Sequence, residues 1–250
     1  MSITGDPDEM PGGGPKKVGI PLADLMTGMY ATVAILAALM RRDRDGGGEY
    51  IDMALLDCQV ATLSNQGQNY LISGEIPRRY GNAHPNVVPY QAFPTVDGHI
   101  IIAIGNDHQF SKFCQEAGEP LLARDSRFLT NADRVRNRDA IVTEVARIVK
   151  QRTTSRWLAT LGPLGVPCGP INDMEQTFAH PQVQHRNMKL EMDHPSSGKV
   201  TLIANPIRFT QHPIVYNRPP PLLGQHTDEV LTGLGLGEAN IASLRAAGIV

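Results

Sequence analysis

The sequence predicts an α/β protein in which a smaller α+β module is inserted between two segments of a larger domain. Three observations support this. Leu22–Met40 consists of small and apolar residues, and Asp24 is its only residue charged at neutral pH, as expected for a buried helix. Alternating segments near residues 90–104 and 188–204 predict two β-hairpins. Between residues 74 and 89, prolines and glycines interrupt both patterns.

Composition narrows the class of protein. The chain has 250 residues, 41% of them apolar and 19% charged, which is typical of a globular protein with a substantial core. The formal net charge is −2 and no long basic run occurs, so we expect neither nucleic acid nor a membrane as a partner. Three widely spaced cysteines favour a reducing compartment, which is the cytoplasm or an organelle matrix, and we expect the cytoplasm.

The first third of the chain predicts mainly helix. Pro21 suits the first turn of a helix, which continues through the apolar stretch to Arg42 and stops at the glycines 46–48. Because this helix is apolar on nearly every face, we expect protein to surround it. Residues 49–55 alternate between polar and apolar types and predict a strand, and residues 56–72 predict a second helix.

The remainder predicts the inserted module and a return to the larger domain. Residues 90–95 and 99–104 form the first expected hairpin, with Asp97-Gly98 at its turn. Helices are expected over 107–117, 133–150 and 155–161, an extended segment over 166–171, a second hairpin over 188–193 and 199–204, and helices over 228–234 and 238–247. We therefore expect a large-domain segment over 1–75, a linker or lid loop over 76–87, a small α+β domain over 88–195, and a return segment with C-terminal helices over 196–250.

Common ligand motifs are missing from the sequence. The glycines 12–14 lack the spacing of a phosphate-binding loop, and Asp43-Arg44-Asp45-Gly46 lacks the rest of a calcium loop. The eight histidines show no zinc-binding spacing, so we expect no metal site. Arg78, Arg79 and Arg208 are candidates for binding a carboxylate, and equally for ordinary surface charges.

Asp24 has two interpretations. An acidic residue in the first turn of a helix is stabilised by the free backbone N–H groups and by the helix dipole. The same donors, with apolar walls that exclude water, also suit a reactive carboxylate that attacks an electrophile. Spacing alone leaves both open.

A family resemblance favours the second interpretation. Matching segments run in the same order along nearly the whole chain: 1–5, 19–28, 37–39, 48–52, 81–85, 89–90, 97–98, 105–110, 165–172 and 219–227. They resemble the class III CoA-transferases, and most closely their succinate–hydroxymethylglutarate branch. The resemblance implies a Rossmann-like large domain with an inserted α+β domain, of which this chain would hold the C-terminal two-thirds. It also implies that coenzyme A is a co-substrate and that Asp24, in the A-D-x-x-T-G motif, is the nucleophile.

In this family the aspartate attacks an acyl-CoA thioester to give a mixed anhydride, then an aspartyl-CoA thioester, from which an acceptor acid takes the coenzyme A. The resemblance further places Leu55 beside bound CoA, and Gly81, Asn82, Ala83 and His84 where some members have a glycine-rich lid. An α-methylacyl-CoA racemase of the same superfamily, in which the aspartate shuttles a proton, is one alternative. A non-catalytic fragment is another.

The resemblance also implies a homodimer of interlocked chains. It further implies that in the family a Rossmann-like segment precedes the segment that begins here at Met1. We therefore expect the 250-residue chain to have little transferase activity by itself and to expose apolar helix surface.

Overall fold

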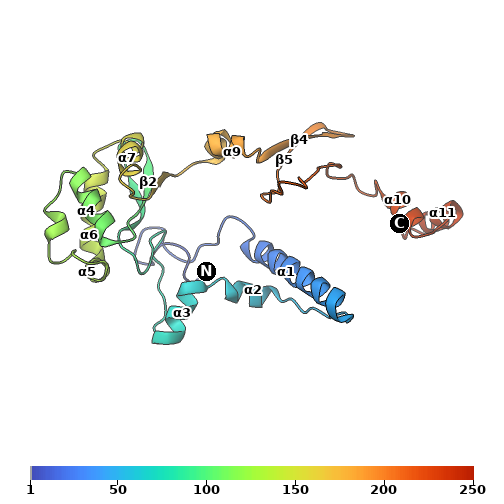
Figure 1. Cartoon of the computed structure of the whole chain (residues 1–250), viewed down its shortest axis with the longest axis horizontal. Coiled ribbons are helices and arrows are strands. Elements are labelled where there is room, and N and C mark those ends of the chain that lie inside the picture. Colours follow the sequence, from blue (N-terminus) through green and yellow to red (C-terminus); the bar gives the residue numbers. More distant parts are fainter. Residues whose placement is uncertain (1) are drawn as a thin grey trace. The chain divides into compact units, whose positions relative to one another are not determined.

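A computed structural model describes residues 2–250, which divide into two compact units, 2–171 and 172–250. Figure 1 labels most of their helices and strands along the chain. The first unit contains α1 (Leu22–Asp45), α2 (Leu55–Ala61), α3 (Ser64–Ser73), β1 (Tyr90–Pro94), β2 (His99–Ala103), α4 (Asp107–Glu116), the 3₁₀ turn η1 (Leu122–Arg124), α5 (Asn131–Arg136), α6 (Arg138–Val149), α7 (Thr154–Leu161) and β3 (Cys168–Pro170). The predicted bounds of the four domain segments stay predictions.

The first unit contains a three-stranded antiparallel sheet, in the order β1-β2-β3. Tyr90 pairs with Ala103 in the first hairpin, and Ile101 of the middle strand pairs with Gly169 of β3. The Asp97 carboxylate accepts hydrogen bonds from the Thr95 hydroxyl (3.0 Å) and the Thr154 N–H (2.8 Å), which connects the hairpin turn to the start of α7. The predicted first hairpin is confirmed.

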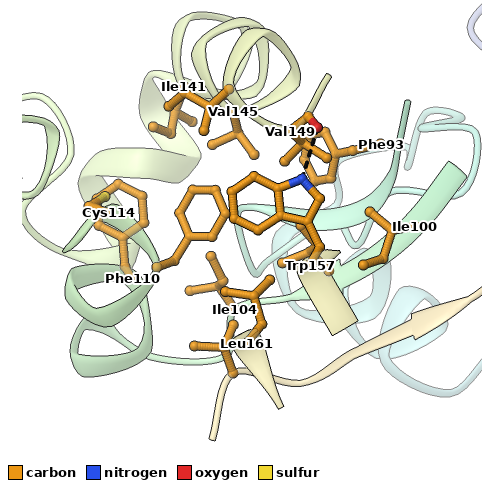
Figure 2. Packing of buried hydrophobic residues seen from close by; sticks show 14 of the residues in the cluster. Phe93, Ile100, Ile104, Phe110, Cys114, Ile141, Val145, Val149, Trp157 and Leu161 are labelled. Atoms are coloured by element: carbon orange, nitrogen blue, oxygen red, sulfur yellow. Dashed lines mark hydrogen bonds between the residues drawn. The ribbon is translucent and has the colours of Figure 1, made fainter. Parts of the chain in front are cut away.

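The main hydrophobic core lies between this sheet and helices α4, α6 and α7. Figure 2 shows Trp157 at its centre, with its indole N–H donating to the Val149 carbonyl oxygen (2.9 Å). Phe113 stacks against the Trp157 ring at a centroid distance of 5.9 Å. Each large apolar side chain buried here stabilises the fold by about 1.5–3 kcal/mol. Every member of the buried cluster falls between Val88 and Val166, so residues 88–166 hold a core of their own.

Helix α1 differs from what the sequence predicts. None of its residues is buried, and its apolar side chains are exposed, including Met29 (59%), Val33 (61%) and Met40 (75%). The expectation that protein surrounds α1 is therefore wrong for this chain. The physical reason is that α1 packs against the short helix α2, which is too small to cover all of its faces. The expectation of exposed apolar helix surface is confirmed.

By length and composition, α1 is also the one helix among residues 2–250 that could cross a membrane, with a hydropathy of 1.7. The core helices of many water-soluble proteins have the same length and composition, so this property alone does not place α1 in a membrane.

Two other expectations for the first unit need correction. Residues 49–55 form no strand, because no neighbouring strand pairs with them and an isolated strand leaves its backbone groups unpaired. The helix expected over 56–72 is interrupted between α2 and α3, where Ser64 has a positive φ of 48°. The helix expected over 133–150 is likewise divided into α5 and α6 at Asn137, whose backbone is not helical (φ −108°, ψ 34°).

The second unit contains α8 (Met174–Ala179), α9 (Pro181–His185), β4 (Lys189–His194), β5 (Gly198–Ile203), α10 (Thr227–Gly233) and α11 (Glu238–Ala246). The predicted hairpin is confirmed, since β4 pairs antiparallel with β5 from Lys189 opposite Ile203 to His194 opposite Gly198. Helix α8 was not predicted. Asp173 and Gln176 form a reciprocal capping box at its start, and this D-x-x-Q pattern is a signal in the sequence that predicts such a helix.

Candidate functional site

Asp24 lies in the first turn of α1, directly after the position where the chain enters the helix. Pro21 occupies the N-cap position and offers no side-chain hydrogen bond, so the first-turn N–H groups have no side-chain cap. The Thr27 hydroxyl donates to the Ala23 carbonyl oxygen (2.7 Å) and is thereby held against the helix backbone. Helix geometry thus places the carboxylate near free backbone donors and the positive end of the helix dipole.

The Asp24 side chain is exposed, and within residues 2–250 its carboxylate takes part in no hydrogen bond or ion pair. A carboxylate without a partner is chemically free to attack an electrophile. The apolar walls expected around it are incomplete in this chain, because Leu25 beside it is 54% exposed and Leu22 and Met26 are only partly buried. The expectation of an enclosed carboxylate is therefore wrong for the chain by itself, while the nucleophilic role stays a prediction.

Leu55 is the first residue of α2 and is 53% exposed. Because α2 packs against α1, Leu55 and Asp24 belong to neighbouring helices. An exposed leucine at this place is able to contact the apolar part of a ligand. Its role beside CoA stays a prediction.

The loop Gly81–His84 is held closely against β1. The Asn82 side-chain oxygen accepts from the Ala92 N–H (2.8 Å), and the His84 N–H donates to the Tyr90 carbonyl oxygen (2.9 Å). The His84 ring stacks on Tyr90 at 5.4 Å, and its Nδ1 accepts the N–H groups of residues 86 and 87 at 3.1 Å each. These contacts occupy the Asn82 side-chain oxygen and the His84 Nδ1. Opening this loop as a lid would break its contacts with β1, those of Asn82 with Ala92 and of His84 with Tyr90.

The N-terminal segment anchors the other end of this loop. The Gly81 N–H donates to the Gly5 carbonyl oxygen (2.9 Å), and a Cβ atom added to Gly81 would lie 2.8 Å from an Asp6 carboxylate oxygen. The Arg79 side chain is only 13% exposed, forms an ion pair with Asp8 and donates to the Asp6 carbonyl oxygen (3.2 Å). The sequence carried no signal for this anchor, since the partners lie more than 70 positions apart in the chain.

A cluster of cationic and aromatic side chains lies beside the loop. The guanidinium carbons of Arg78 and Arg138 are 5.0 and 4.7 Å from the centroid of the Tyr80 ring. Arg138 also donates to the carbonyl oxygens of His84 (3.1 Å) and Pro85 (2.5 Å). Burial lowers the pKa of Arg138, and the nearby Arg78 charge contributes to this lowering.

Of the three arginines named above as candidates for binding a carboxylate, the structure thus places Arg78 and Arg79 beside the loop 81–84. Arg208 is exposed in the second unit. No hydrogen bond or ion pair joins Asp24 to the loop in the part of the chain that the structure describes. The described residues also contain no group of three or more His, Cys, Asp or Glu side chains placed to hold a metal ion.

Comparison with known proteins identifies a matching family model and similar relatives of this chain. The model of CoA-transferase family III matches residues 1–227. Succinate–glutarate CoA-transferase of Agrobacterium fabrum is 44% identical over 94% of this chain and 58% of its own length. Human succinyl-CoA:glutarate CoA-transferase is 41% identical over the whole chain and 56% of its own length. The chain therefore spans less than three-fifths of the length of these relatives.

Two solved structures also superimpose on this chain. A CaiB/BaiF family protein of Brucella suis superimposes with a TM-score of 0.75 at 43% identity, over 94% of this chain and 60% of the other. A Mycobacterium tuberculosis protein superimposes with a TM-score of 0.76 at 26% identity, over 88% of this chain.

Proposed function

The chain belongs to CoA-transferase family III, and from this membership we propose that it transfers coenzyme A between an acyl-CoA and a small dicarboxylic acid through a covalent intermediate on Asp24. The observation that carries the proposal is the identity of 44% and 41%, over 94% and 100% of this chain, to two relatives named for transfer between succinate and glutarate. The position of Asp24, partner-free at a helix start, supports the assignment of the nucleophile.

The proposed reaction proceeds by exchange between carboxylates and thioesters. The Asp24 carboxylate attacks the acyl carbonyl of the acyl-CoA, the C–S bond breaks and CoA thiolate leaves, which gives a mixed anhydride. The thiolate then attacks the Asp24 carbonyl, releases the first acid as its carboxylate and forms an aspartyl-CoA thioester. The acceptor carboxylate attacks the carbonyl of that thioester, its C–S bond breaks, and CoA thiolate leaves, which gives a second mixed anhydride. The thiolate then attacks the acceptor's carbonyl of this anhydride, which forms the new acyl-CoA and releases Asp24 as its carboxylate. Splitting one transfer into such steps lowers each barrier.

Backbone groups of α1 have a defined part in this proposal. The first-turn N–H groups point along the helix axis toward its N-terminal end, where a negative charge is stabilised. Such donors stabilise the oxyanion that develops as the thioester carbonyl is attacked. Full activity further needs water to be excluded from Asp24, and this chain by itself leaves the carboxylate exposed.

We propose that a second copy of the chain takes part in covering α1, as a homodimer. The exposed apolar side chains along the helix, among them Leu25 (54%), Met29 (59%) and Leu36 (56%), support an interface there. Light scattering after size-exclusion chromatography tests this. A monomer at micromolar concentration would contradict it, and Val33→Glu is expected to shift a dimer to monomers.

We also propose that the protein acts in the cytoplasm. All three cysteines are free thiols in the structure, which suits a reducing compartment. Fluorescence microscopy of a tagged protein, with fractionation as a control, tests this proposal.

The function is tested by turnover together with capture of the intermediate. Purified protein is incubated with succinyl-CoA and glutarate, and glutaryl-CoA is measured by chromatography. Low turnover of this chain is expected because Asp24 is exposed, so the ratio between variants is the readout. Asp24→Asn is expected to reduce transfer by roughly 10³-fold or more, as loss of a covalent nucleophile does. Borohydride added with succinyl-CoA should reduce the Asp24 thioester to an alcohol detectable by peptide mass spectrometry.

Asp43→Asn, at the opposite end of the same helix, is the matched control and should leave transfer and capture unchanged. Equal transfer by Asp24→Asn and the unaltered protein would overturn the proposal, as would an unaltered protein that neither transfers nor captures. Exchange of the substrate α-hydrogen with deuterated water would instead indicate racemase chemistry.

A further inference from the structure

Two arginines converge on one aromatic ring in the first unit. Arg78 lies in the segment before the loop 81–84, and Arg138 is the first residue of α6. Both guanidinium groups contact the ring of Tyr80, at 5.0 and 4.7 Å from its centroid. Two positive charges therefore lie close to one ring, and like charges at short distance repel each other.

Neither of these two charges is neutralised by an ion pair among residues 2–250. The neighbouring arginines contrast with them, because Arg79 is paired with Asp8 and Arg136 with Asp133. Arg138 is half-buried and donates only to uncharged carbonyl oxygens, as far as the described residues show. Of the two cavities beside the pair, the smaller has Asp139 as its one lining carboxylate, and the larger is also lined by Asp8 and Glu9; all three are exposed. The pKa of Arg78 is raised by Tyr80 and, to a smaller extent, by the nearby Asp139 and Glu9, but neither carboxylate forms an ion pair with Arg78 or Arg138 in the described residues.

Open space lies beside both guanidinium groups. A cavity of about 210 Å³ is lined by Arg78, Tyr80 and Arg138, and on its other side by Asn137 and Ala140 in and before the first turn of α6. This volume is sufficient for a small anion. A second cavity of about 500 Å³ shares the same three residues but is also lined by the carboxylates of Asp8, Glu9 and Asp139, so the smaller cavity is the better match for an anion.

We propose that Arg78 and Arg138 form a binding site for a phosphate group, either inorganic phosphate or the phosphate of a nucleotide. Both guanidinium groups line the same cavity of about 210 Å³, which one compact dianion fits better than two carboxylates separated by a methylene chain. Guanidinium groups bind phosphate oxygens through paired N–H donors, and the charge assistance strengthens each bond. A bound dianion also relieves the repulsion between the two arginines.

The site is independent of the proposed transferase chemistry, since it uses neither Asp24 nor Leu55. It is connected to the loop 81–84 through the hydrogen bonds from Arg138 to the carbonyl oxygens of His84 and Pro85. A ligand that holds Arg138 therefore also strengthens the attachment of that loop.

The test is binding of inorganic phosphate to the full chain, measured by isothermal titration calorimetry at an ionic strength held constant with chloride. Arg78→Gln removes one exposed guanidinium and should weaken phosphate binding roughly tenfold or more. Ala140→Asp should do the same, because it places a carboxylate in the cavity, while an acidic residue in the first turn of α6 does not destabilise the helix. Arg156→Gln, which removes an exposed arginine of α7 without an ion-pair partner in the described residues, is the control and should bind like the unaltered chain.

Adenosine 3′-monophosphate and succinate form two further arms. Binding of inorganic phosphate alone assigns a free-phosphate site, and tighter binding of the nucleotide assigns a nucleotide site; both support the proposal provided that both site variants lose the binding. Absence of phosphate binding, equal binding by all variants, or tighter binding of succinate than of phosphate would each overturn it. Thermal denaturation of each variant without ligand confirms that the site variants are folded.

Discussion

Arg134 offers a sharp test of how the inserted module is held together. Its side chain is 0% exposed, and its guanidinium donates to the carbonyl oxygens of Val88 (2.8 Å) and Phe128 (2.9 Å) and to the Asp107 carboxylate (2.8 Å). The guanidinium carbon also lies 4.5 Å from the centroid of the Phe110 ring. This one residue therefore joins the entry to β1, the start of α4 and the segment before α5.

Arg134→Met removes these donors and keeps an apolar stem. Two buried carbonyl oxygens then lose their donors, at about 1–3 kcal/mol each, and the contact with Phe110 is worth about 1 kcal/mol. Asp107 is half-exposed and is rehydrated at little cost. The methionine recovers part of the loss through packing. We therefore expect the free energy of unfolding to fall by roughly 3–5 kcal/mol, in the range for removal of one partner from a buried charged network.

Urea denaturation followed by the fluorescence of Trp157, the single tryptophan and a fully buried one, measures this directly. With a typical urea dependence, the midpoint should shift by roughly 2 M. Arg136→Met is the matched control, because Arg136 lies on the same helix, is exposed and pairs only with Asp133; its cost should stay below about 1 kcal/mol. Similar shifts for the two variants would refute the assignment of Arg134 as the internal connector.

Three further predictions concern single residues. Burial raises the pKa of the Cys114 thiol to about 12, so iodoacetamide at pH 8 should leave it unmodified in the folded chain and modify it in urea, as peptide mass spectrometry would detect. Gly81→Ala meets both a positive φ of 62° and the nearby carboxylate, and should lower the midpoint of thermal unfolding, whereas Gly47→Ala, with open space around it, should not. The hydrogen bond from the Thr154 N–H holds the pKa of Asp97 below its ordinary value, so the stability that ionised Asp97 contributes is present above about pH 4 and is lost as the pH falls. In melting curves recorded at several pH values, the melting temperature of Asp97→Asn should therefore fall less steeply with acid.

Local sequence patterns predicted the elements whose stabilising contacts lie within a few residues along the chain. The Asp97-Gly98 turn between alternating segments gave the β1–β2 hairpin, and α4 and α7 begin where polar caps precede apolar periodic segments. The N-cap side chains of Asn106 and Thr153 accept N–H groups of the first turns of these two helices. The breaks at Ser64 and Asn137 could not be predicted, because single backbone angles there depend on contacts that periodicity does not encode.

In the candidate site, too, the sequence predicted the local features and missed the contacts between distant residues. The motif around Asp24 located a helix start and, through the resemblance, a nucleophile. The anchoring of the loop 81–84 by Arg79 and the contact of Arg138 with Tyr80 depend on partners that are dozens of residues away, and charge patterns along the chain give no register for such contacts. Sequence reasoning therefore singled out Arg78 and Arg79 as cations but could not separate the paired arginine from the unpaired one.

The exposure of α1 calls for a different explanation of its apolar composition. A helix apolar on nearly every face is usually explained by burial in its own domain, yet here each apolar side chain of α1 is at least partly solvent-accessible. Covering such surface stabilises by about 25 cal/mol for each Å² removed from water, so α1 carries a strong drive toward association that the inserted module, with its own core, does not need. This surface includes Leu25, which is 54% exposed and follows Asp24 in the first turn of the helix. It follows that any partner that buries the apolar side chains of the first turns also removes water from around Asp24, so association and activation of the carboxylate are expected to occur together.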